Sequence, residues 1–155
     1  MSQLKEGVKA PEFKAISNEG KEVSLKDYQG KKRVVLYFYP KDDTPGCTVE
    51  ACAFRDNVKK IQKSGAVVLG VSPDGLKAHE KFIQKFGLPF LLLADEEKKV
   101  CQAYGVWVEK SMYGRKYMGV ARTTLVIGKD GKIEKVYEKV KPEGHAEEVL
   151  EFLNA

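Results

Sequence analysis

The hydrophobic positions along the chain form two kinds of pattern. The first kind is a short apolar or alternating run, often with β-branched and aromatic residues, which is typical of β-strands. Such runs lie at residues 13–16, 22–25, 34–39, 66–71, 123–127 and 133–137. The runs at 34–39 and 66–71 are apolar throughout, so we expect them to be central strands covered on both faces.

Turn-forming residues separate two pairs of neighbouring runs. Asn18-Glu19-Gly20 lies between the first two runs and predicts an N-terminal β-hairpin. Lys129-Asp130-Gly131 lies between the last two runs and predicts another hairpin.

The second kind of pattern repeats hydrophobic residues at helical spacing. It covers a segment that begins near Cys47 and includes Phe54, Val58 and Ile61, and it covers residues 76–86 and 96–104. A last segment starts near Glu143 and places Ala146 and Leu153 on its apolar face. His79 lies on the apolar stripe of its segment and is expected to be packed, whereas His145 is expected to be exposed. Strands that alternate with helices predict an α/β domain with a central mixed sheet flanked by helices, and we expect residues 1–155 to form one domain.

Charge and composition narrow the function classes. The formal charge of +5 comes from 27 Lys and Arg against 22 Asp and Glu. The lysines are spread along the chain beside acidic residues, as in Lys26-Asp27, which indicates a solvated surface rather than a nucleic-acid site. The apolar runs are too short for a membrane span and the first residues contain no apolar block, so we expect a cytoplasmic protein without membrane contact.

The chain has three cysteines, an odd number that argues against a disulfide framework in a cytoplasmic protein. The remaining roles are catalysis, metal binding and inert burial. Cys101 lies in a predicted helix with no charged motif around it and is interpreted as buried and inert.

Cys47 occupies a position that favours reactivity. Thr44 is the expected N-cap of the helix and Pro45 its first residue, so Cys47 is the third helical residue. A thiolate at this position meets free backbone N–H groups and the positive end of the helix dipole, both of which stabilise it. Gly46 leaves the backbone open to a small ligand.

Two neighbouring acids oppose the thiolate. Asp42 and Asp43 precede the helix and would disfavour a thiolate if their carboxylates faced the sulfur. A nearby cation is therefore required, and Arg122 is a candidate because arginine keeps its charge when it is desolvated.

The spacing between Cys47 and Cys52 has a conformational consequence. Residues five apart in a helix have Cα atoms roughly 8–9 Å apart and face different directions. A disulfide requires Cα atoms within about 7 Å of each other. These two cysteines can therefore bond only if the start of the helix unwinds.

The pattern Pro40-x-x-x-Thr44-x-x-Cys47 resembles the signature of the peroxiredoxins. The fuller string from Pro40 to Thr48, followed by Glu50-Ala51-Cys52, is similar to the bacterioferritin-comigratory (PrxQ-type) branch of that family. The resemblance covers essentially the whole chain and includes Arg122-Thr123-Thr124.

The resemblance implies a thioredoxin-like fold and the reduction of hydrogen peroxide and organic hydroperoxides without a metal or organic cofactor. Cys47 matches the peroxidatic cysteine, and Cys52 matches the resolving cysteine of one group within the branch. Thr44 and Arg122 match residues that hold and polarise the peroxide, and Pro40 matches the wall of the pocket, with Gly46 beside it. The resemblance also implies thioredoxin or a similar dithiol protein as reductant, and a monomer.

Three alternatives stay open from the residues alone. A zinc site could combine Cys47, Cys52 and Cys101 with a histidine, although no second Cys pair follows the C-x4-C spacing. The same cysteines could serve a thiol–disulfide oxidoreductase or a redox-responsive binding protein. A cysteine hydrolase would require a histidine partner, and no local signature places either histidine for that role.

Overall fold

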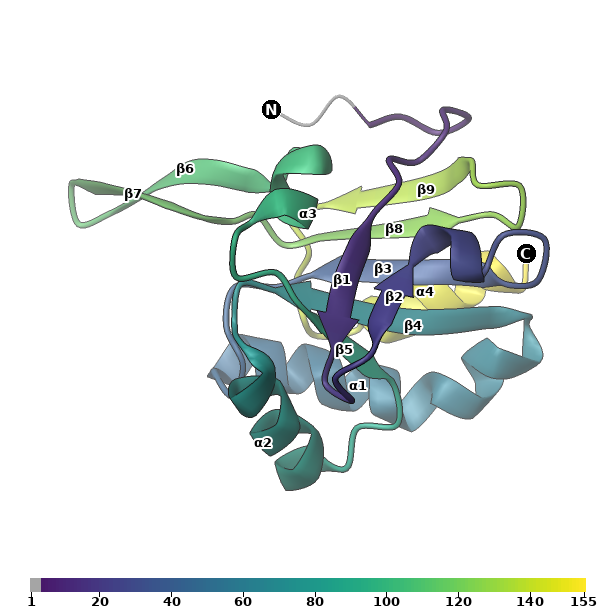
Figure 1. The fold of residues 1–155 in the computed structure, drawn as a ribbon, viewed down its shortest axis with the longest axis horizontal. Coiled ribbons are helices and arrows are strands. Elements are labelled where there is room, and N and C mark those ends of the chain that lie inside the picture. Colours follow the sequence, from purple (N-terminus) through teal and green to yellow (C-terminus); the bar gives the residue numbers. More distant parts are fainter. Residues whose placement is uncertain (1–3) are drawn as a thin grey trace.

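The computed structural model describes residues 4–155, which form a seven-stranded mixed sheet, helices on both faces and a separate two-stranded arm (Figure 1). The strands of the sheet are β1 (Lys14–Ser17), β2 (Glu22–Ser24), β3 (Arg33–Phe38), β4 (Ala66–Ser72), β5 (Leu91–Ala94), β8 (Thr123–Ile127) and β9 (Ile133–Glu138). The arm consists of β6 (Trp107–Met112) and β7 (Arg115–Val120). The helices are α1 (Pro45–Lys63), α2 (Leu76–Phe86), α3 (Lys99–Ala103) and α4 (His145–Leu153), and Leu25–Asp27 forms a 3-10 turn.

The sheet has the strand order β2-β1-β5-β4-β3-β8-β9. The central strands β3, β4 and β5 are parallel, and the other neighbouring pairs, including the N-terminal hairpin β1–β2, are antiparallel. The predicted mixed sheet and both predicted hairpins are confirmed.

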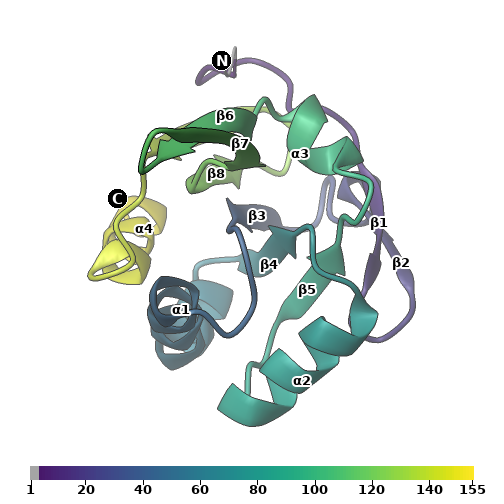
Figure 2. The ribbon, with the colours of Figure 1, turned by 90° about the vertical axis from the view of Figure 1, so that its left-hand side faces the viewer.

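Side chains that alternate along β3 build a core on each face of the sheet. Val34, Leu36 and Phe38 join one buried cluster, and Val35 and Tyr37 join the other. The first cluster includes residues of α3 and of the N-terminal segment, whereas the second includes residues of α1, α2 and α4, as the arrangement of the helices shows (Figure 2). Each fully buried large apolar side chain stabilises the fold by roughly 1.5–3 kcal/mol.

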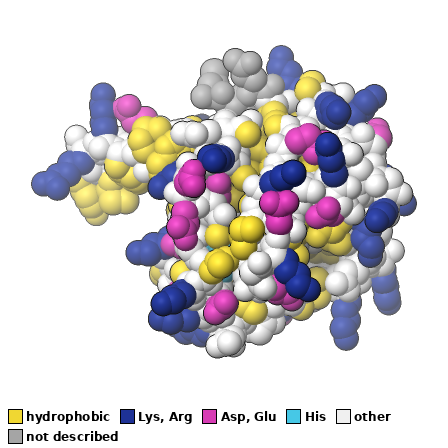
Figure 3. All heavy atoms as spheres, in the orientation of Figure 1, with side chains coloured by type: hydrophobic (Ala, Val, Ile, Leu, Met, Phe, Trp, Pro, Cys, Tyr) yellow, Lys and Arg dark blue, Asp and Glu magenta, His cyan; other side chains and the backbone are white. Residues whose placement is uncertain are grey.

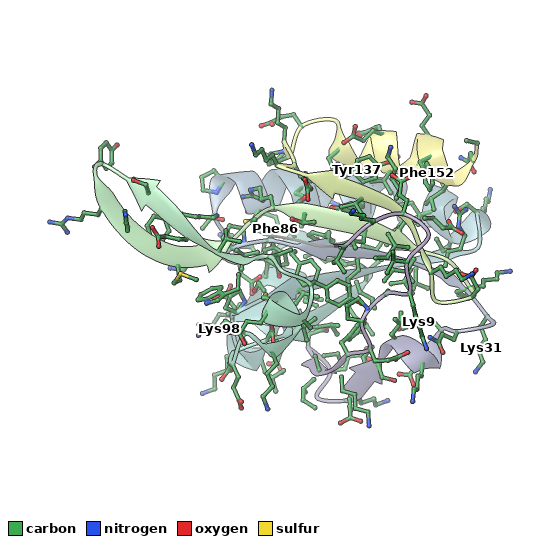
Figure 4. All side chains as sticks on the ribbon, turned by 90° about the horizontal axis from the view of Figure 1, so that it is seen from above. Lys9, Lys31, Phe86, Lys98, Tyr137 and Phe152 are labelled. Atoms are coloured by element: carbon green, nitrogen blue, oxygen red, sulfur yellow. The ribbon has the colours of Figure 1, made fainter. Side chains whose placement is uncertain are left out.

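The packing extends to the ends of the sheet. Seen from above, side chains fill the space between the sheet and the helices, with Tyr137 of β9 and Phe152 of α4 on the α4 side (Figure 4). Among the described residues, no helix is both long enough and apolar enough to cross a membrane.

The helix α2 begins and ends at the predicted residues. Gly87 follows it with φ 61°, a left-handed conformation that glycine adopts without strain and that ends the helix. The helix α3 is shorter than the predicted segment 96–104. Lys98 has φ 60°, and the Asp95 carboxylate accepts hydrogen bonds from the backbone N–H groups of Val100 and Cys101, so the helix begins only after this turn.

The prediction that His145 is exposed is wrong. His145 is the first residue of α4 and is only 1% exposed. Its ring nitrogens lie 2.7 Å from Thr124 Oγ1 and 2.7 Å from Glu148 Oε1, and the ring packs edge-on against Phe54 and Tyr137. The His145 side chain therefore connects the first turn of α4 to Thr124 of β8.

The strand β5 and the arm were not predicted from the sequence. The arm projects away from the body, and hydrophobic and basic side chains share its surface (Figures 1 and 3). Met112, Tyr113 and Met118 are all exposed on it, so its strands lack the alternation that a half-buried strand shows.

Candidate active site at the start of α1

Cys47 lies in the first turn of α1, at the position expected from the sequence. Thr44 is the N-cap residue with extended backbone angles, Pro45 is the first helical residue, and Cys47 is the third. The thiol is buried, with the residue only 1% exposed. The Thr44 hydroxyl donates a hydrogen bond to the Lys41 carbonyl oxygen at 2.8 Å and does not cap the helix. The Thr44 oxygen therefore keeps its lone pairs free to accept a hydrogen bond from a ligand.

Arg122 supplies the cation that the site requires. Its Nη2 donates a hydrogen bond to Cys47 Sγ at 3.0 Å. The register of the sheet explains this proximity, because Phe38 at the end of β3 pairs with Thr123 at the start of the antiparallel strand β8. The segment that follows β3 and the residue that precedes β8 consequently lie at the same edge of the sheet.

Asp42 and Asp43 bind other partners. The Asp42 carboxylate accepts a hydrogen bond from the Tyr39 hydroxyl at 2.5 Å and lies 2.6 Å from His79 Nδ1. The Asp43 carboxylate forms an ion pair with Lys85 Nζ at 2.8 Å. Both acids are thus tied to groups other than the sulfur, two of which belong to α2, and their opposition to a thiolate is reduced.

His79 is packed, as predicted, and is fully buried. Its Nε2 lies 3.0 Å from the Leu93 carbonyl oxygen and its Nδ1 faces Asp42. The ring therefore connects the loop before α1 to α2 and β5. The ring nitrogens of both histidines are engaged with groups other than Cys47, so the hydrolase alternative gains no support.

Glu50 is a site residue that the sequence analysis missed. It lies one helical turn after Cys47, is 1% exposed, and its Oε1 accepts a hydrogen bond from Arg122 Nη1 at 3.2 Å. Burial raises the pKa of Glu50 to about 7, and the opposing effect of Arg122 is smaller. The spacing of three residues, which places two side chains on one face of a helix, was the available signal.

Gly46 and Pro40 shape the surroundings of the thiol. A Cβ atom at Gly46 would lie 2.9 Å from Arg122 Nη2, so a larger residue at this position would require the guanidinium to shift. Pro40 is half-buried, two residues after the end of β3.

Cys52 and Cys101 occupy different environments. Cys52 is half-buried, also on α1, and all three cysteines are free thiols. Cys101 is fully buried in the cluster on the opposite face of the sheet from Cys47. Burial and a hydrogen bond with Asp95 raise the pKa of Cys101 well above its ordinary value, which fits the interpretation of an inert thiol. Within residues 4–155, no group of three or more His, Cys, Asp and Glu side chains is arranged to hold a metal ion.

Comparison with protein families gives a match over residues 7–136 to the AhpC/TSA family. The chain belongs to this family. Within it, the chain is 54% identical over 144 residues to a putative peroxiredoxin Bcp of Coxiella burnetii, a match that covers 93% of this chain and 95% of the relative. It is 48% identical over 147 residues to peroxiredoxin Bcp of Bacillus subtilis, covering 95% of this chain and 93% of the relative.

A solved structure of the bacterioferritin comigratory protein of Xanthomonas campestris, described for its alkyl peroxide reduction activity, superimposes on this AhpC/TSA protein with a TM-score of 0.90. The two are 34% identical, and the match covers 97% of this chain and 98% of the other. The predicted membership of the peroxiredoxins and the thioredoxin-like fold are therefore confirmed. The protein is a thiol peroxidase.

Proposed function

We propose that Cys47 is the peroxidatic cysteine of this peroxidase and that Cys52 resolves it. The observation that carries the proposal is the 3.0 Å contact between Arg122 Nη2 and Cys47 Sγ at the start of a helix. A guanidinium keeps its charge at a desolvated site, and free N–H groups of the first turn add to its effect. Both stabilise a thiolate that solvent barely reaches.

In the first step the thiolate attacks one oxygen of a hydroperoxide and the O–O bond breaks. The attacked oxygen stays on sulfur as a sulfenic acid, and the other oxygen leaves as hydroxide or alkoxide and takes up a proton. Arg122 and the backbone N–H groups of the first turn stabilise the developing negative charge. The Thr44 oxygen orients the hydroperoxide by accepting its O–H, and Pro40 and Gly46 border the pocket.

The substrates of the proposal are hydrogen peroxide and organic hydroperoxides. The alkyl peroxide reduction attributed to the Xanthomonas relative supports the second class. The groups at the site suffice for this chemistry without an organic cofactor or a metal ion.

In the second step the Cys52 thiol displaces the sulfenic hydroxyl as water, and a disulfide forms. Both residues belong to α1, so the helix start must unwind before the sulfur atoms meet. The first turn is held by the hydrogen bond from the Thr48 N–H to the Thr44 carbonyl, and Pro45 has no N–H to contribute. Each backbone hydrogen bond that opens costs only about 1 kcal/mol, which makes such unwinding accessible.

Thioredoxin or a similar small dithiol protein completes the cycle by thiol–disulfide exchange. The proposal includes a monomer that works in the cytoplasm, a compartment in which thiols are kept reduced. Sedimentation analysis of the reduced and oxidised protein tests the oligomeric state.

Mass spectrometry of the disulfides formed by one equivalent of hydrogen peroxide tests the proposal. We expect a Cys47–Cys52 linkage in the natural protein, an unreactive Cys47→Ser variant, and a Cys52→Ser variant that stops at the sulfenic acid. Cys101→Ser is the matched control and should react like the natural protein. Unchanged peroxide consumption by Cys47→Ser would refute the assignment of Cys47, and a Cys47–Cys101 linkage would refute that of Cys52.

A further inference from the structure

One guanidinium at the site serves two buried acids. Arg122 Nη2 lies 3.0 Å from Cys47 Sγ, and Arg122 Nη1 lies 3.2 Å from Glu50 Oε1. Cys47 and Glu50 are each 1% exposed, whereas the Arg122 side chain is 21% exposed. The two acids thus share one positive charge at a place that water barely reaches.

The second carboxyl oxygen of Glu50, Oε2, accepts no hydrogen bond from residues 4–155. Among the described residues, Glu50 Oε2 and the Tyr37 hydroxyl are the buried side-chain polar atoms without a hydrogen-bond partner. A buried carboxylate oxygen without a donor carries a substantial penalty when it is charged. This environment favours the protonated form of Glu50, which the proximity to Arg122 only partly opposes.

Other charged and titratable groups face the pair from neighbouring elements. Tyr37 approaches from β3, and burial followed by the charges of Glu50 and Asp42 raises its pKa, so it stays neutral. Lys110 approaches from β6; burial and Arg122 lower its pKa, while Cys47 raises it. Lys110 is half-buried at the rim, so Arg122 remains the cation in direct contact with both acids.

Charge balance then determines how many protons the pair holds. If thiolate and carboxylate were both charged, the buried group of three would carry a net negative charge, which desolvation disfavours. With one proton shared between the two acids, the guanidinium faces a single negative charge. Ionisation of Cys47 is therefore coupled to protonation of Glu50.

We propose that Glu50 stores the proton of the first half-reaction, taking it up as Cys47 ionises and returning it to the leaving oxygen of the hydroperoxide. This inference rests on the proposed function. The thiolate and the hydroperoxide give the sulfenic acid and an alkoxide, and the Glu50 carboxyl and the alkoxide then give a carboxylate and the alcohol. The leaving oxygen is held by the same guanidinium that Glu50 contacts, which places acceptor and proton side by side. After the step Arg122 faces the Glu50 carboxylate and a neutral sulfenic acid, so the charge balance is preserved.

The test compares leaving groups in single-turnover oxidation of Cys47, measured with Glu50→Gln, which has the same shape but no proton to exchange. An alkyl hydroperoxide expels a strongly basic alkoxide that needs a proton, whereas a peracid expels a carboxylate that does not. We expect Glu50→Gln to slow oxidation by the alkyl hydroperoxide about 100-fold, as for loss of a general acid, and to leave oxidation by the peracid nearly unchanged. The natural protein should show a pH dependence near neutrality with the alkyl hydroperoxide, and Glu50→Gln should lack it. Glu50→Asp should restore part of the rate and part of the pH dependence.

Glu80→Gln, an exposed glutamate on α2, is the matched control and should match the natural protein with both oxidants. Equal slowing with both oxidants by Glu50→Gln would mean that Glu50 only supports the structure of the site, and would overturn the inference. An unchanged rate with the alkyl hydroperoxide would overturn it as well. Both results leave the proposed function intact as long as Cys47→Ser is inactive, so failures of the two proposals are distinguishable.

Discussion

The buried carboxyl of Glu50 makes a quantitative prediction about stability. Burial raises its pKa from an ordinary value of 4.5 to about 7. Between these two values the folded protein binds a proton that the unfolded chain releases, so the free energy of unfolding falls as the pH rises. The shift of about 2.5 pKa units, at 1.36 kcal/mol each, corresponds to about 3 kcal/mol. Glu50→Gln removes this titration and should be the more stable protein at alkaline pH.

Urea unfolding of the reduced protein at a series of pH values from 4.5 to 8.5 measures this effect. The stability difference between Glu50→Gln and the natural protein should grow in favour of the variant by about 3 kcal/mol across that range. Glu80→Gln, which changes an exposed glutamate, should follow the natural protein at every pH. Parallel stability curves for Glu50→Gln and the natural protein would refute the reasoning, because the carboxyl would then titrate alike in the folded and unfolded states.

Three further substitutions test other parts of the structure. Gly46→Ala places a Cβ 2.9 Å from Arg122 Nη2, so stopped-flow measurements should show about 100-fold slower oxidation by peroxide, and a rate within a few-fold of normal would count against this contact. Burial lowers the pKa of His145, so its contribution to stability is complete above about pH 6.5 and is lost as the pH falls toward the lower pKa of the folded protein. In urea unfolding, the free energy of unfolding of His145→Gln should therefore depend less on pH below about pH 6.5 than that of the natural protein. The same pH dependence in both proteins would contradict the lowered pKa of His145. Asp42→Asn weakens the bond to His79 and should lower the free energy of unfolding in urea by about 1–3 kcal/mol, whereas an unaltered midpoint would show that the loop is held elsewhere.

The central elements of the fold could be predicted because their signals are local. Residues 76–86 repeat hydrophobic residues with helical period and end at a glycine, and the structure has α2 at those residues. The strand β5 follows Pro89 closely and is only four residues long, so its apolar run is too short to show a strand period. The two strands of the arm are largely exposed. Their pairing therefore leaves no alternation of apolar and polar residues from which it could be predicted.

At the site, the sequence indicated the reactive cysteine but not its complete environment. The N-cap and the first turn around Cys47 follow from neighbouring residues. The burial of Glu50 depends on Arg122, which lies 72 positions later in the chain, and an isolated glutamate in a helix is normally solvated. The orientation of Asp42 likewise depends on His79, 37 positions away. Long-range partners of this kind leave no periodic pattern in a single sequence.

The pairing of β3 with β8 determines where an insertion in the chain would disturb the position of Arg122 relative to Cys47. The turn between β8 and β9 lies at the other end of β8 from Arg122, so insertions there leave the distance to Cys47 intact. A one-residue insertion within β8 would shift Arg122 by one position against β3 and turn its side chain toward the opposite face. The guanidinium would then lie on the side of the sheet that holds Cys101, and a chain that still folded would carry an uncompensated Cys47. Natural length variation compatible with activity should therefore concentrate in the turns remote from this edge of the sheet.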